Sequence, residues 1–234
     1  MLLCNPDIIS FVSLSHMINR RQALKRFLAL ASWALGVLGY ATFCFRIPLA
    51  WTKRRILEKT ASLTELIHAN PKNLDAHKLE TTPIEQFDVM GQTAHPVNIN
   101  EWKFEVRGAV NTPMRFSYQD LTQRPVLERN VLLICAGFFA YNGLWKGFSV
   151  ADLLNEAGLK PGVTHVKFSG PRGIRGKTKK FTIEEVMANQ IFIAYGVNGQ
   201  VLPERHGFPM RLVAEDYKGY RWVKYVDRLT VIAK

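Results

Sequence analysis

The pattern of hydrophobic and polar residues changes twice along the 234-residue chain. Residues 27–45 form an apolar run without a charged side chain, and residues 51–82 are polar with scattered apolar positions. From about residue 83 onward, short apolar runs alternate with turn residues. This order predicts a targeting or anchor segment over residues 1–50, a helix and linker over 51–82, and one folded domain over 83–234.

The folded part is predicted to contain more strands than helices. Residues 102–108 alternate large and charged side chains, as a half-buried strand does. Further strands are expected at residues 130–134, 164–170, 191–199, 209–216 and 222–234. Ser117, Ser149 and Thr182 are typical helix caps, and the helix after Ser149 is expected over residues 150–157. Because the helices are too short and irregular for βαβ units, the pattern predicts a mixed α+β domain.

The N-terminal apolar run follows a cluster of basic residues. Arg20 and Arg21 are adjacent, and Lys25 and Arg26 come just before the run. This layout is typical of an export signal, and adjacent arginines indicate the twin-arginine type. A poor cleavage site favours a retained membrane anchor over a cleaved leader. Met1 and a downstream methionine at position 17 both fit as the start.

The formal net charge of +12 is unevenly distributed. Residues 1–60 carry nine Lys/Arg against two Asp/Glu, a net of +7, and the remainder carries 22 against 17, a net of +5. A nucleic-acid-binding protein would concentrate this charge on its folded domain, so the sequence does not favour nucleic-acid binding. A basic stretch at residues 171–180 fits a solvated hairpin, or docking to an acidic redox partner or anionic membrane.

Cys135 is the only cysteine in the predicted folded domain, because Cys4 and Cys44 lie in the N-terminal part. No cysteine pair has zinc-binding spacing, and a disulfide framework is not supported. Cys135 stands where a predicted buried strand gives way to an Ala-Gly step. Taken alone, it fits core packing, a nucleophile paired with His206, or a ligand of a soft metal.

Two basic turns near the C-terminus are candidates for binding an anion. His206 and Arg211 flank a loop stiffened by proline and glycine, and Lys218, Arg221 and Lys224 follow around a second glycine. Arginine presents a planar set of donors that matches phosphate, and exposed loop amides form anion-binding nests. The two turns therefore predict either a clamp for one anionic ligand or two solvated loops.

Two stretches together resemble the sulfite oxidase superfamily of molybdenum enzymes. They are LLICAGFF followed by LWKGFSVADLL within residues 132–154, and NGQVLPERHGFPMRLVAEDYKGYRWVKYV at residues 198–226. The resemblance is strongest to the small exported bacterial members, of the periplasmic protein-methionine-sulfoxide reductase type. It implies a mixed-sheet domain that binds molybdopterin, with the thiolate of Cys135 as the molybdenum ligand at the catalytic centre. The cofactor-binding positions that it implies are Asp88, Val89, Cys135, Gly170, His206, Arg211, Trp222, Val223 and Lys224.

One departure from the family bears on the substrate. Sulfite-oxidising relatives carry arginines soon after the cysteine, where this chain has Phe138, Phe139 and Ala140. An apolar wall does not compensate the desolvation of a dianion such as sulfite. The expected function is a periplasmic, molybdopterin-dependent reductase of an S- or N-oxide. The aromatic residues from Phe138 to Tyr141 are expected to shape its substrate pocket.

The resemblance also implies a separate redox partner. Because the sequence contains no haem-binding segment, electrons are expected from another protein, such as a membrane haem protein. The alternatives are a sulfite-type dehydrogenase with an external acceptor, and a non-catalytic, membrane-anchored binding protein on the same fold.

Overall fold

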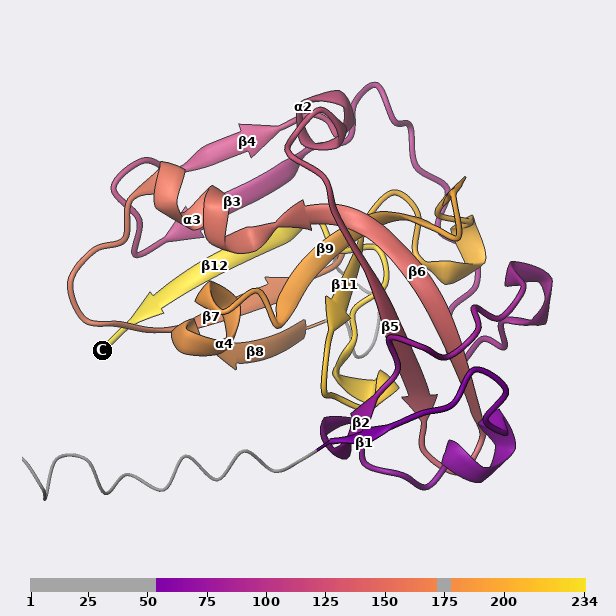
Figure 1. Cartoon of the computed structure of the whole chain (residues 1–234). Helices are drawn as coiled ribbons and strands as arrows, with labels where there is room; N and C mark the ends of the chain where they lie inside the picture. The colour runs from indigo at the N-terminus through magenta and orange to yellow at the C-terminus, as the bar shows by residue number, and fades with distance from the viewer. Residues whose placement is uncertain (1–53, 172–177) are drawn as a thin grey trace, which may run out of the picture. The chain divides into compact units, whose positions relative to one another are not determined.

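The structure is a computed structural model that describes residues 54–171 and 178–234. The predicted targeting segment at residues 1–50 therefore lies outside the described residues. Residues 52–234 belong to one compact unit (Figure 1). Within the described part, no helix is long and apolar enough to cross a membrane.

The first large sheet is antiparallel and has the strand order β10-β9-β6-β5, with β11 also paired to β9. Its longest members, β5 (Leu127–Cys135) and β6 (Phe139–Ser149), form a hairpin that bends across the molecule (Figure 1). The other strands are β9 (Ile191–Val197), β10 (Gln200–Val201) and β11 (Arg211–Ala214). Every residue of β9 is buried, so this strand lies in the interior.

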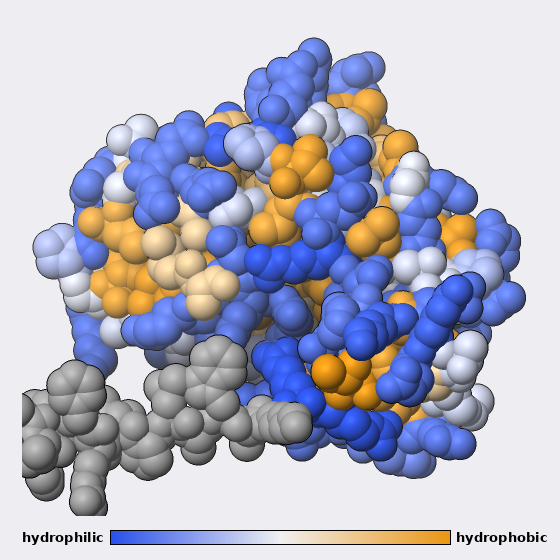
Figure 2. Space-filling model, in the orientation of Figure 1, coloured by the Kyte–Doolittle hydropathy of each residue, from blue (hydrophilic) through white to orange (hydrophobic). Residues whose placement is uncertain are grey.

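The second large sheet is mixed and has the order β4-β3-β12-β7-β8. Its strands are β3 (Phe104–Gly108), β4 (Met114–Phe116), β7 (Val163–Ser169), β8 (Thr178–Thr182) and β12 (Arg228–Ala233). Strand β12 pairs parallel with β3 and antiparallel with β7. Buried side chains from both sheets form one main core. On the face seen in Figure 2, the remaining hydrophobic residues form separate groups among hydrophilic ones.

Short helices connect the strands, as the capping residues predict. The helices α2 (Tyr118–Thr122), α3 (Val150–Ala157) and α4 (Ile183–Met187) begin directly after Ser117, Ser149 and Thr182. Each of these side chains accepts a hydrogen bond from a backbone amide of the first helical turn, which is otherwise without a partner. The mixed α+β fold class is thus confirmed for the described residues.

Residues 54–82, which we call the strap, differ from the expected helix and linker. They form the short strands β1 (Arg55–Ile56) and β2 (Leu74–Asp75), paired in parallel, and the 3-10 helices η1 (Leu63–Leu66) and η2 (Pro71–Asn73). A third 3-10 helix, η3 (Ile84–Gln86), follows. The strap leucines are spaced irregularly, so they fit a folded-over chain and not the apolar stripe of an α-helix.

The predicted strand at residues 222–234 is shorter in the structure. Strand β12 begins only at Arg228, and residues 222–227 form a loop after η5 (Gly219–Arg221). Val223 makes a single bridge to Leu212, and Tyr225 has a positive φ of 59°, which interrupts an extended strand. This loop turns residues 222–224 towards the first sheet.

Candidate active site

A cavity of about 220 Å³ opens at the end of the β5–β6 hairpin. Its walls come from the hairpin, the loop after η3, the connection between β10 and β11, and the region around η5. Most of the residues predicted from the sequence as a site line this cavity: Asp88, Val89, Cys135, His206, Arg211, Trp222 and Lys224. Segments up to 136 positions apart in the sequence, from Asp88 to Lys224, are therefore brought together.

Two predicted site residues do not line the cavity. The side chain of Val223 is fully buried in the main core, although its backbone accepts a 2.8 Å hydrogen bond from Leu212 of β11. Gly170 follows β7 in the other sheet and is also outside the cavity lining. The Val223 side chain therefore does not face this cavity, and Gly170, which has no side chain, lies outside its lining.

Cys135 is the last residue of β5 and pairs with Phe139, the first residue of β6. Because successive side chains on a strand point to opposite faces, Leu133, Cys135 and the facing residues Phe139 and Tyr141 share the cavity face of the hairpin. A tight turn joins the strands, with the Phe138 amide donating to the Cys135 carbonyl at 2.9 Å. The cysteine is thus fixed by strand pairing and not carried on a free loop.

The Cys135 thiol is free and half-buried. Burial raises its pKa, and no neighbouring cation among the described residues offsets that effect. A cysteine nucleophile requires the opposite, a positive group that stabilises the thiolate. The thiol–imidazole alternative with His206 is therefore not supported, whereas a bound metal cation would supply the missing stabilisation.

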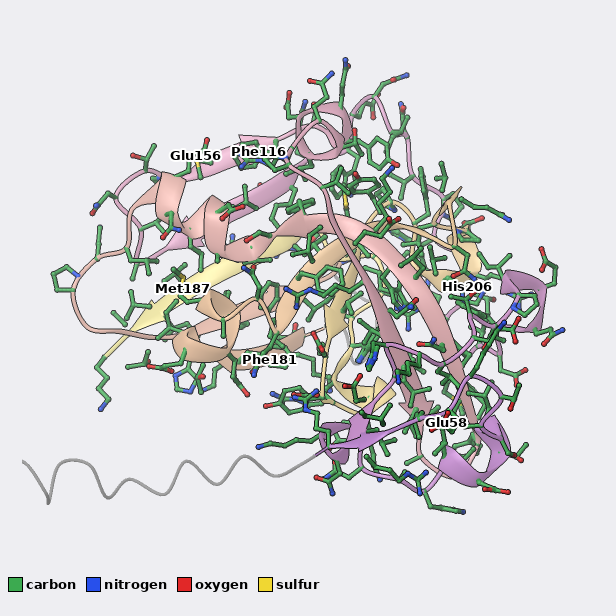
Figure 3. The ribbon with its side chains drawn as sticks, in the orientation of Figure 1. Glu58, Phe116, Glu156, Phe181, Met187 and His206 are labelled. Carbon is green, nitrogen blue, oxygen red and sulfur yellow. The ribbon has the colours of Figure 1, made fainter. Side chains whose placement is uncertain are left out.

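Three cationic side chains surround His206, which ends η4 (Glu204–His206) and is labelled in Figure 3. Arg205 donates from Nε to Nε2 of His206 at 3.2 Å, Arg211 donates to the His206 carbonyl at 2.8 Å, and Lys224 donates to the Arg205 carbonyl at 3.1 Å. Burial, together with the positive charges of these three residues, lowers the pKa of His206 to about 3. His206 is therefore neutral at physiological pH.

Arg211 is buried against two aromatic rings that also contact each other. Its guanidinium lies 5.3 Å from the ring centre of Trp145 and 5.2 Å from that of Trp222. The Nε atom is buried and has no hydrogen-bond partner in the described structure. A buried donor without a partner is energetically costly, which suits a site completed by an anionic ligand.

The donors present fit a molybdopterin cofactor. Cys135 offers a soft sulfur ligand for the metal, and Arg211 and Lys224 offer positive charge and donors for a phosphate group. No group of three or more His, Cys, Asp or Glu side chains suited to holding a metal ion occurs among the described residues. The protein therefore fits a metal whose other ligands come from an organic cofactor.

Sequence reasoning missed several cavity residues and misplaced one. Leu133, Met90, Gly219 and Tyr220 also line the cavity. Leu133 belongs to the continuous apolar run before Cys135, which does not single it out, and the others lie in a loop or in the short helix η5, which give no periodic signal. Phe138, expected at the substrate pocket, is 69 % exposed and is not part of the lining, because it sits on the turn between the strands.

The fold and the site together define an oxidoreductase domain for an anionic metal cofactor. The sequence profile of the oxidoreductase molybdopterin binding domain matches residues 91–234, and the chain belongs to this family. It is therefore a molybdopterin-binding enzyme, and the non-catalytic alternative is not supported.

This chain aligns with only a part of each curated relative. The chain is 28% identical over 156 residues to the protein-methionine-sulfoxide reductase catalytic subunit MsrP of Gluconobacter oxydans, covering 60% of this chain and 49% of that protein. It is 28% identical over 212 residues to nitrate reductase [NADH] 1 of Arabidopsis thaliana, covering 75% of this chain and 23% of that protein. The chain thus spans about half or less of these relatives.

A solved structure supports the fold. The sulfane dehydrogenase SoxCD of Paracoccus pantotrophus superposes with a TM-score of 0.56 at 22% identity, covering 81% of this chain and 54% of that one. This likeness extends beyond the matched family domain, because 81% of the chain is more than residues 91–234. It supports the sulfite-oxidase-type arrangement of the sheets.

Proposed function

We propose that this enzyme reduces a neutral S-oxide or N-oxide, most naturally a sulfoxide. The observation that carries the proposal is the character of the cavity wall next to Cys135. Leu133 and Phe139 flank the thiol on the same face of the hairpin, and among the described residues no cation is near enough to lower the pKa of Cys135. Such a wall favours a neutral substrate with apolar substituents over an oxyanion.

The protein residues hold the cofactor at two ends of the cavity. Cys135 is assigned as the metal ligand, and Arg211, Lys224 and Trp222, with neutral His206, hold the anionic part. Asp88 and Val89 close the site from the loop after η3. When bound, molybdopterin supplies the metal centre at which an oxygen atom is exchanged and two electrons pass. The chain itself positions this group, keeps water from its apolar wall and presents the substrate.

The proposal also covers the export of the protein and the source of its electrons. The basic and apolar N-terminal residues support export to the periplasm by the twin-arginine route, with the segment either cleaved or retained as an anchor. A separate redox protein, such as a membrane haem protein, would then supply electrons. N-terminal sequencing of the mature protein distinguishes the two fates of the segment.

Nitrate is a second candidate substrate because several relatives are nitrate reductases. A nitrate ion needs cationic or donor groups beside the metal, and the cavity concentrates its cations around His206 instead. Sulfite, the substrate of the dehydrogenase alternative, makes the same demand with a larger charge. The structure therefore favours the sulfoxide over both anions.

Substrate assays on the purified, molybdenum-loaded enzyme test the proposal. A reduced viologen dye would supply electrons to methyl sulfoxides and, separately, to nitrate, while a dye acceptor would report oxidation of sulfite. We expect a kcat/KM for sulfoxide at least about a hundredfold above that for nitrate, equivalent to roughly 2.7 kcal/mol of transition-state discrimination. Turnover of nitrate or sulfite at equal or greater efficiency would reject the proposal.

A further inference from the structure

Tyr141 lines the cavity but is not among the cofactor-binding positions that the family resemblance implies. It lies on β6 two residues beyond Phe139, and on the same face of the hairpin as Cys135. Its side chain is only 2 % exposed and yet lines the cavity. The phenol group is near enough to both Cys135 and Arg211 to interact electrostatically with each. Tyr141 therefore lines the same cavity as the proposed metal ligand and the cationic cluster and is near both.

Aromatic packing fixes the orientation of the Tyr141 ring. Phe87 stacks on it with ring centres 3.9 Å apart and planes inclined by 18°, and Phe139 lies parallel within 9° at 5.9 Å. A ring held between two others has few accessible rotamers, so its hydroxyl is held in one direction without a large loss of entropy on binding.

The hydroxyl of Tyr141 is available as a hydrogen-bond donor. The guanidinium of Arg211 carries only donors, so its favourable interaction with the Tyr141 phenol is with the phenol oxygen and leaves the phenol hydrogen unused. Among the described residues, no acceptor for the phenol hydrogen is found. Burial raises the pKa of Tyr141, so the hydroxyl keeps its proton at physiological pH.

We propose that Tyr141 is a cofactor-binding residue whose hydroxyl donates a hydrogen bond to molybdopterin from the wall between Cys135 and Arg211. A ligand that reaches both of those residues occupies the cavity that Tyr141 lines. The ring stack with Phe87 and Phe139 holds the phenol in place, and the positive charge of Arg211 lies near its oxygen. Tyr141 and Arg211 thus act as a pair of donors on one side of the cavity. This inference does not depend on the identity of the substrate.

Retention of the cofactor by Tyr141→Phe tests the proposal without any turnover. This change removes one oxygen atom and keeps the ring between Phe87 and Phe139. Molybdenum per chain would be measured by elemental analysis, and pterin by the fluorescence of its oxidised product, during incubation of the loaded enzyme at raised temperature. We expect the cofactor to leave about tenfold faster than from the wild type, the effect of one lost hydrogen bond.

Tyr195→Phe is the matched control. Tyr195 lies on β9, is 9 % exposed and does not line the cavity, so its substitution removes the same atom elsewhere. It should retain the cofactor as the wild type does. Thermal unfolding of the cofactor-free forms shows whether either variant is generally destabilised, and equal midpoints are expected.

One outcome would overturn the proposal: release of the cofactor from Tyr141→Phe at the wild-type rate. If the KM for sulfoxide then rises in this variant, the hydroxyl meets the substrate and not the cofactor. Failure of the enzyme to reduce sulfoxides would reject the proposed function alone, because cofactor retention is measured without substrate.

Discussion

The two faces of the β5–β6 hairpin have opposite tasks. On one face, Leu133, Cys135 and Tyr141 line the cavity and join the main core. On the other face, Leu132 and Ile134 pack against the strap leucines in a separate cluster. The cavity face contains ionisable groups and donors, whereas the buried members of the strap cluster are all leucine or isoleucine.

The strap also holds the back of the hairpin by hydrogen bonds. Asn142 donates from its side chain to the Leu79 carbonyl at 2.8 Å, and its own carbonyl accepts from Thr82 at 2.8 Å. The turn after Cys135 is held by the Gly137 amide, which donates to the Ile67 carbonyl at 3.2 Å. The two faces of the hairpin therefore differ in role: residues on the cavity face serve the chemistry, and their neighbours on the strap face serve stability. Substitutions one position apart should therefore have different effects.

Cys135→Ser gives the largest expected change on the cavity face. Serine is nearly isosteric but lacks the soft thiolate donor, so turnover in the dye assay should fall by more than about a hundredfold. The free energy of unfolding of the cofactor-free protein should change by less than about 1 kcal/mol, because the thiol is half-buried and unpaired. Retained turnover in a molybdenum-loaded sample would contradict the ligand assignment.

Ile134→Ala is the counterpart on the strap face. Ile134 is 0 % exposed and packs among strap leucines, so its truncation should lower the free energy of unfolding by about 2–5 kcal/mol. Chemical denaturation of the cofactor-free protein measures this loss. The specific activity of the fraction that remains folded and loaded should be close to wild type. A loss of activity without a loss of stability would show that the two faces are not separate.

Asn142→Ala tests the hydrogen bonds between the strap and the hairpin. Asn142 is fully buried, and its side chain bonds to the backbone of Leu79 and Glu80. Without it, these buried carbonyls lose a donor, at a cost of about 1–3 kcal/mol in the free energy of unfolding. Protease cleavage within residues 54–82 should also become faster. Unchanged cleavage and stability would indicate that the leucine cluster alone holds the strap.

The pH dependence of the free energy of unfolding should reveal the buried, neutral His206 of the cavity. The pKa of His206 is lowered to about 3, so the unfolded chain binds more protons below pH 6.5, and stability falls as pH falls from 6.5 towards 3. At pH 5 the resulting loss in the free energy of unfolding is up to about 2 kcal/mol for the cofactor-free protein. His206→Gln should lose less stability between pH 7 and pH 5. Parallel curves for both proteins, followed by thermal unfolding, would argue against a buried neutral histidine.

Local signals in the sequence account for much of the fold. Ser117, Ser149 and Thr182 each begin a helix as expected, because capping depends on a few neighbouring residues. The strap was not foreseen, because its leucines are stabilised by Leu132 and Ile134, far along the chain. Contacts of this kind leave no periodic pattern in the segment itself.

The same distinction applies to the site. The thiol and the basic turns could be predicted from residue type, and seven of the nine implied positions line one cavity. The position of Tyr141 near both Cys135 and Arg211 depends on the pairing of β5 with β6 and on the packing of Phe87. Val223 illustrates the limit of a linear motif, because its neighbours Trp222 and Lys224 line the cavity while its own side chain enters the core.

Phe138→Ala should have the smallest effect, and it tests whether the turn between β5 and β6 contributes to either face of the hairpin. Phe138 is 69 % exposed and belongs to neither the cavity lining nor the strap cluster. Its truncation should change the free energy of unfolding by about 0.5 kcal/mol or less and leave molybdenum retention unchanged. Phe139→Ala, one residue further, should reduce retention, because it removes the ring stacked on Tyr141. Equal effects of both substitutions would show that the turn acts as part of the cavity.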